Sequence, residues 1–113
     1  KPVGRGYVII EPTSAHPWCR QKSRSASADF CHPLHAHEFH YSEIRGLPAD
    51  TRYAYTVQRG HGVDGTNDGI LRHNLLASYT HLRDTVGCRW PARFIQYARD
   101  CSTHSRETAP CLT

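Results

Sequence analysis

The sequence contains no methionine and no apolar run approaching the roughly 20 residues that a membrane-spanning helix needs. We therefore expect no membrane association. The first residues, Lys1 to Gly6, have no apolar run behind their charges, so they do not form a secretory signal. Because an initiator methionine is also missing, we expect the natural polypeptide to begin upstream of Lys1.

Cysteine pairs with C-x-x-C spacing are absent as well. The five cysteines stand at positions 19, 31, 88, 101 and 111. Their odd number, together with the missing export signal, favours reduced thiols in a cytoplasmic protein over a disulfide framework.

The basic charge of the chain has no nucleic-acid-binding motif beside it. Lys and Arg number 14 against 10 Asp and Glu, so the formal net charge is +4. The arginines are scattered singly, and the densest basic patch (residues 20–24) lies in a Ser-rich stretch without a known motif. We expect no nucleic-acid partner, whereas an anionic small molecule would suit dispersed arginines.

The residue pattern predicts several strands and one helix. β-branched and aromatic runs favour strands at residues 6–11, 34–44 and 52–58, and a mostly apolar run favours a buried strand at 75–82. A helical period begins at Trp90 and ends at Cys101. A complete α/β domain needs more helices to cover its sheet. We therefore predict part of an α/β domain over residues 1–101, followed by a disordered tail over residues 102–113.

Residues 34–44 alternate between two kinds of side chain, as in a strand. One side is aromatic: His37, Phe39 and Tyr41. The other side is polar: Glu38, His40 and Ser42. We expect the aromatic side to face the core and the polar side to line a site. The strand at 52–58 could pair with this one as an antiparallel hairpin.

Four segments together resemble a known family. They are His16-Pro17-Trp18, Ala36-His37-Glu38-Phe39-His40-Tyr41-Ser42, Asp68-Gly69-Ile70 and Asn74-Leu75-Leu76-Ala77-Ser78-Tyr79-Thr80-His81-Leu82. In this order they are similar to the C-terminal half of the amidotransferase domain of the cobyrinic acid a,c-diamide synthase family. The resemblance extends from about Arg5 to Phe94. Residues 59–68 and 82–84 further resemble a branch linked to sulfur metabolism, whose members are thought to amidate sirohaem.

The resemblance implies a partial class I, triad-type glutamine amidotransferase domain with a flavodoxin-like, three-layer fold. In this family a cysteine hydrolyses glutamine with the help of a histidine. The ammonia passes to a synthetase domain, where ATP and magnesium activate a tetrapyrrole carboxylate. The parent protein is thus expected to be a cytoplasmic, ATP- and glutamine-dependent amide ligase.

The resemblance assigns His81 as the catalytic histidine and places Glu38 and His40 at the border of the glutamine site. A thiol is only slightly ionised at neutral pH, and a hydrogen-bonded imidazole converts it into a thiolate nucleophile. The resemblance assigns no metal ligand in this chain.

Two parts of the family pattern are missing. No Cys-Gly-Gly elbow precedes the strand at residues 6–11, and no P-loop is present. We therefore expect the chain alone to bind no cofactor and to show no glutaminase activity. Absent strands would leave an apolar sheet edge exposed, so we expect self-association or a partner chain.

Two other functions remain open. Cys31, His35 and His37 could bind one zinc ion, because two histidines separated by one residue share a face of a strand. Alternatively, the chain could be a non-catalytic module that binds an anion or a tetrapyrrole through its arginines.

Overall fold

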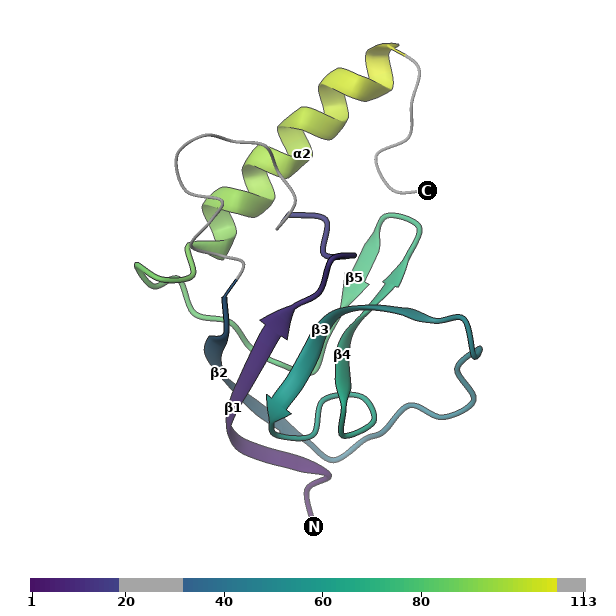
Figure 1. Ribbon diagram of the computed structural model, residues 1–113, viewed down its shortest axis with the longest axis vertical. Coiled ribbons are helices and arrows are strands. Elements are labelled where there is room, and N and C mark those ends of the chain that lie inside the picture. The colour runs from purple at the N-terminus through teal and green to yellow at the C-terminus, as the bar shows by residue number, and fades with distance from the viewer. Residues whose placement is uncertain (19–31, 108–113) are drawn as a thin grey trace.

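The computed structural model describes residues 1–18 and 32–107. This part of the chain is α/β and rich in strands, with its helix at the C-terminal end (Figure 1). Its elements are β1 (Gly4–Pro12), β2 (Leu34–His40), β3 (Arg52–Arg59), β4 (Asn67–Arg72), β5 (Leu75–Ala77) and α2 (Trp90–Glu107). The predicted strands at 6–11 and 52–58 are thus confirmed, with small changes at their ends.

The five strands form one antiparallel sheet in the order β2-β1-β3-β4-β5. β1 lies between β2 and β3, so the predicted hairpin between residues 34–44 and 52–58 is wrong. Both edges of β1 are paired, one with β2 and one with β3, and its apolar inward residues Val8 and Ile10 are almost completely buried. β1 therefore separates the two strands that the predicted hairpin would have paired.

β2 alternates as predicted, but its two sides are exchanged. Glu38 and His40 are buried, whereas Phe39 is 48% exposed and Tyr41 is 63% exposed. Burial of the polar side is possible because Glu38 and His40 bond to each other and to backbone groups. The expectation that the aromatic side faces the core is wrong.

The predicted strand at residues 75–82 is mostly absent. β5 comprises only Leu75–Ala77, and Leu75 is 55% exposed. Beyond β5 the chain turns back to the free edge of β2, where His81 forms an isolated antiparallel bridge with His37. The curled sheet is therefore joined to its own first edge at this one position.

The described part of the chain has a small apolar core on the inner face of the sheet. Its buried members are Val8, Ile10, Trp18, Leu34, Ala36, Ala54, Tyr55 and Cys88. Several polar side chains are also buried in the interior: His16, Glu38, His40, Asp68, Thr80 and Arg93. Of these, Glu38, His40, Asp68 and Thr80 set the local geometry of the candidate site.

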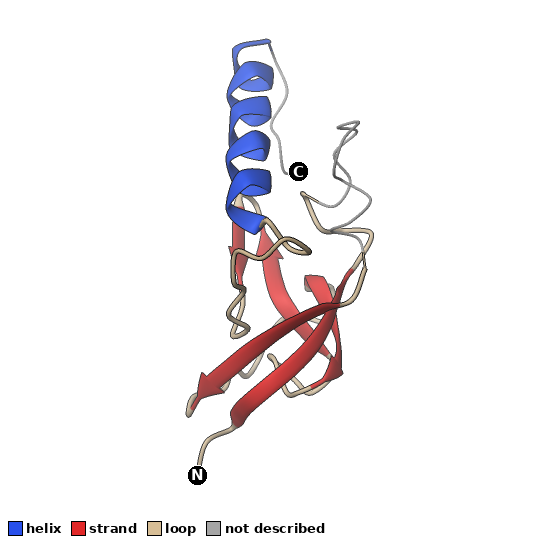
Figure 2. Ribbon diagram, turned by 90° about the vertical axis from the view of Figure 1, so that its left-hand side faces the viewer, coloured by secondary structure: helices blue, strands red, loops and turns tan. Residues whose placement is uncertain are grey.

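The helix α2 begins at Trp90, as predicted, but continues to Glu107 rather than ending at Cys101. It contacts the rest of the protein mainly through its first turns, where Trp90 stacks on Trp18 and Phe94 meets Trp18 edge-on. Its C-terminal half extends beyond the ends of the strands (Figures 1 and 2). The molecule is accordingly elongated, with extents of 48 × 33 × 18 Å.

The cysteines agree with the expectation of reduced thiols only in part. Cys88 is a buried free thiol, but Cys101 takes part in a disulfide bond. In the described residues, no helix combines the length and the apolar character that crossing a membrane would require.

Candidate functional site

His81 lies at the surface beside the free edge of β2. Its amide donates to the carbonyl of His37 at 2.7 Å, and the amide of His37 donates back to the carbonyl of His81 at 3.3 Å. These two bonds fix its backbone, while its side chain is exposed. An imidazole held in this way is accessible to a reacting group that approaches from outside.

Asp68 fixes the two residues that precede His81. Its Oδ1 accepts the amide of Tyr79 at 3.1 Å, and its Oδ2 accepts both the amide of Thr80 at 2.9 Å and the hydroxyl of Thr80 at 2.6 Å. Asp68 is completely buried. Its carboxylate therefore ties the chain after β5 to the inner face of β4.

Glu38 and His40 form a buried pair on β2. Nε2 of His40 lies 2.8 Å from Oε2 of Glu38, and its Nδ1 lies 3.0 Å from the carbonyl oxygen of Ser42. The carboxylate also accepts the amides of His61 at 2.6 Å and Gly62 at 3.0 Å. Both ring nitrogens of His40 thus lie within hydrogen-bond distance of oxygen atoms.

The environment of Glu38 favours its ionised form. Burial alone would raise the pKa of Glu38, but the amides of His61 and Gly62 and the side chain of His40 outweigh burial and lower it. The carboxylate is therefore charged, and it anchors the loop that contains His61 and Gly62 to β2.

Two glycines make room for this pair. Gly4 lies opposite His40 in the sheet, and a Cβ on Gly4 would clash with Nε2 of His40. Gly60 has a φ of +123°, and a Cβ there would lie 3.0 Å from Oε1 of Glu38. A side chain at either position would displace the groups around Glu38.

Tyr79 connects the buried pair to the segment that precedes His81. Its ring stacks on His40 with a centroid distance of 3.7 Å and an interplanar angle of 12°. Its hydroxyl lies 3.0 Å from Oγ of Ser42. The structure thus joins Glu38 directly to His40, and joins both to His81 through Tyr79 and the backbone of β2.

The sequence alone assigned no role in the site to Asp68 or Tyr79. A signal for Asp68 was present, because aspartate is unfavourable in strands and requires a specific partner there. The Asp68-Gly69-Ile70 segment also belongs to the resemblance. The partners of Asp68 lie 11 and 12 residues further along the chain, and only the fold brings them to it.

His16 forms a second buried polar cluster, near the start of α2. Nε2 of His16 lies 3.0 Å from the hydroxyl of Tyr55, and its Nδ1 accepts the amide of Trp18 at 3.1 Å. Burial lowers the pKa of His16 to about 3 and raises the pKa of Tyr55. A neutral imidazole therefore holds Trp18 in place against α2.

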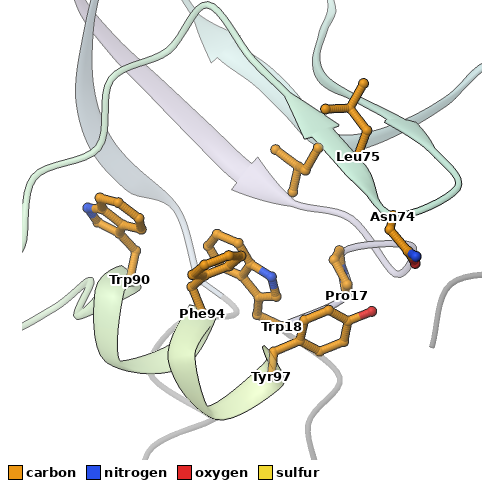
Figure 3. A pocket seen from close by; sticks show the side chains of 8 residues that line it. Pro17, Trp18, Asn74, Leu75, Trp90, Phe94 and Tyr97 are labelled. Carbon is orange, nitrogen blue, oxygen red and sulfur yellow. The ribbon is translucent and has the colours of Figure 1, made fainter. Parts of the chain in front are cut away.

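A separate apolar pocket of about 370 Å³ lies between α2 and the turn that joins β4 to β5 (Figure 3). Its lining residues are Pro17, Trp18, Asn74, Leu75, Leu76, Trp90, Phe94 and Tyr97. None of the three residues assigned from the sequence lines it. The pocket is therefore distinct from the surface around His81.

The structure agrees with the proposed zinc site only in part. His35 and His37 share the exposed side of β2, as predicted. Cys31, the third proposed ligand, lies outside the described residues. Within residues 1–18 and 32–107, no group of three or more His, Cys, Asp or Glu side chains could hold a metal ion.

Comparison with known proteins finds relatives named cobyrinate a,c-diamide synthase. The protein with that name from Magnetococcus marinus is 39% identical over 106 residues, which cover 94% of this chain and 21% of the relative. The Methanosarcina barkeri protein is 39% identical over 64 residues (57% of this chain and 13% of the relative), and the Methanosarcina acetivorans protein 48% over 46 residues (41% and 9%). This chain thus spans about a fifth of the length of the Magnetococcus marinus relative. No family model and no solved structure matches.

Proposed function

The chain matches the cobyrinate a,c-diamide synthase family along 94% of its length, and on this basis we propose that it forms part of a glutamine-dependent amide ligase. In this proposal, residues 1–101 are the C-terminal part of a triad-type, flavodoxin-like glutaminase domain. The rest of the enzyme binds ATP, magnesium and the tetrapyrrole carboxylate. The supporting observation is the match to the Magnetococcus marinus protein along nearly the whole chain.

His81 is the general base in this proposal. It takes the proton of a cysteine thiol, the thiolate attacks the carboxamide carbon of glutamine, and the imidazolium returns the proton to the departing ammonia. Water then hydrolyses the thioester and releases glutamate. The exposed side chain and the doubly bonded backbone of His81 support this role, because the base must be both accessible and fixed.

Glu38 and His40 border this glutamine site from the inside. Glu38 is 1% exposed and already accepts bonds from two amides and His40, so it suits a supporting role better than direct contact with glutamine. The pair would shape the site by fixing the loop at residues 61–62 and the ring of Tyr79.

The printed names of the relatives support cobyrinate as the acceptor, with two of its carboxylates converted to amides. Sirohaem remains the alternative acceptor from the resemblance to the sulfur-linked branch.

A chimera tests the proposal. The segment of the Magnetococcus marinus protein that matches this chain is replaced by these 113 residues, so that the relative supplies the remainder. With ATP, magnesium and glutamine, the chimera should amidate cobyrinate, and His81→Ala should reduce the glutamine-dependent rate at least about 100-fold.

Ammonia serves as the internal control. An ammonium salt bypasses glutamine hydrolysis, so His81→Ala should leave the ammonia-dependent rate unchanged. Equal glutamine-dependent rates for the chimera and its His81→Ala variant would refute the role of His81. The isolated chain should release no glutamate from glutamine, and release that His81→Ala abolishes would refute the need for an external cysteine.

A further inference from the structure

Both carboxylate oxygens of Asp68 accept hydrogen bonds from the residues that precede His81. Its three hydrogen bonds go to Tyr79 and Thr80, and none goes to a residue of its own hairpin. We propose that Asp68 is the positioning residue for His81. The effect of Asp68 on catalysis rests on the function proposed above, whereas the effect of Asp68 on the geometry of His81 does not.

The hairpin of β4 and β5 does not need Asp68 for its own structure. Three register pairs close it, from Ile70 opposite Ala77 to Arg72 opposite Leu75. The bonds of Asp68 begin beyond the end of β5, where the ladder has stopped. They therefore act on the direction in which the chain leaves the hairpin.

That direction decides whether His81 reaches β2. With the amides of Tyr79 and Thr80 held on β4, the next amide is presented to the carbonyl of His37 at 2.7 Å. The stacking of Tyr79 on His40 supports the same segment from a second side. Since Asp68 and Thr80 are buried, water cannot readily replace the two bonds between them.

Asp68→Asn tests the positioning role, because it conserves the shape of the side chain but replaces one acceptor oxygen by an NH₂ donor. Either amide orientation turns an NH₂ group toward an N–H of Tyr79 or Thr80. Hydrogen exchange of the full chain, followed by NMR, should show the His81 amide exchanging at least about tenfold faster, and the ring resonances of His81 should shift. Amides of β1 in the centre of the sheet should keep their protection.

Asp64→Asn is the matched control. Asp64 also accepts backbone amides, from Thr66 at 2.9 Å and Asn67 at 2.7 Å, but in the turn between β3 and β4. This variant should leave the exchange and ring resonances of His81 unchanged. If Asp68→Asn does not fold, Thr80→Val replaces it, because it removes only the hydroxyl donor to Asp68 and should speed exchange at His81 to a smaller extent.

Unchanged exchange and ring resonances of His81 in the folded Asp68→Asn protein, or in Thr80→Val where that variant stands in, would overturn the proposal. An equal loss of protection over the whole sheet would do the same, because it would show a general structural role. In the chimera, Asp68→Asn should lower kcat with glutamine at least about tenfold, with little change in KM for glutamine or in the ammonia-dependent rate. A chimera inactive with glutamine would contradict the proposed function, while the exchange data would still decide the role of Asp68.

Discussion

At the scale of single residues, the protein buries polar side chains where each one has partners. Glu38 has two backbone amides and His40, and Asp68 has two amides and a hydroxyl. Buried polar groups are costly when unpaired and specific when paired. The interior polar groups thus fix loops that an apolar core would leave free.

The buried neutral His16 makes the stability of the fold dependent on pH. Its pKa is lowered from 6.5 to about 3, so below pH 6.5 the unfolded chain binds a proton that the folded protein does not. Stability therefore falls as the pH falls through this range, by about 2 kcal/mol between pH 6.5 and 5. Urea unfolding at several pH values measures the effect.

Two variants separate His16 from the other histidines. His16→Asn removes the titrating group and should flatten the dependence between pH 6.5 and 5, whereas the exposed His35→Gln should retain it. Glu38 contributes separately at lower pH, since its lowered pKa means that stability is lost as it becomes protonated. The same slope in His16→Asn as in the natural sequence would contradict the prediction.

At the scale of elements, local pattern predicted where strands and the helix begin more reliably than how they associate. The alternation of β2 was evident from the sequence, but its buried side was assigned from hydrophobicity alone. The partners of Glu38 are the amides of His61 and Gly62, more than 20 residues away. Without those contacts in view, the polar side had no reason to be inside.

The attachment of α2 depends on Trp18. This side chain is 7% exposed, stacks on Trp90 and meets Phe94 at a centroid distance of 5.3 Å. Trp18→Ala should cost about 3 kcal/mol and loosen the helix before the sheet. Amides in the first turns of α2 should lose protection in hydrogen exchange, while those of β1 and β3 remain protected.

Ile95→Ala provides the comparison on the same helix. Ile95 is 49% exposed, so its truncation should have a much smaller effect on stability and on helix protection. If Trp18→Ala changes stability no more than Ile95→Ala does, the aromatic contact does not hold α2.

At the scale of the whole molecule, one face of the sheet carries aromatic side chains that are uncovered in the described structure. Tyr7 is 79% exposed and contacts His37 on the same face, and Phe39 meets Tyr41 edge-on at a centroid distance of 5.5 Å. An exposed aromatic face beside a strand edge favours association. We expect the isolated chain to self-associate or to require a partner chain.

Light scattering measures this association. The average mass should rise with protein concentration, and Phe39→Thr combined with Tyr41→Thr should reduce the rise. Val86→Thr is the control, because Val86 is 92% exposed and belongs to the segment before α2 rather than to the strands that carry the aromatic side chains. A monodisperse monomer at high concentration would show that the face does not drive association.

The sequence by itself determined the family, and it also determined the positions of most strands and of the start of the helix. These depend on residues close together in the chain, where period and propensity act. The order of the strands, the burial of Glu38 and His40 and the hold of Asp68 on the segment before His81 were decided only by the tertiary structure. Each of them depends on which distant backbone amides reach a buried carboxylate, and no local pattern contains that information.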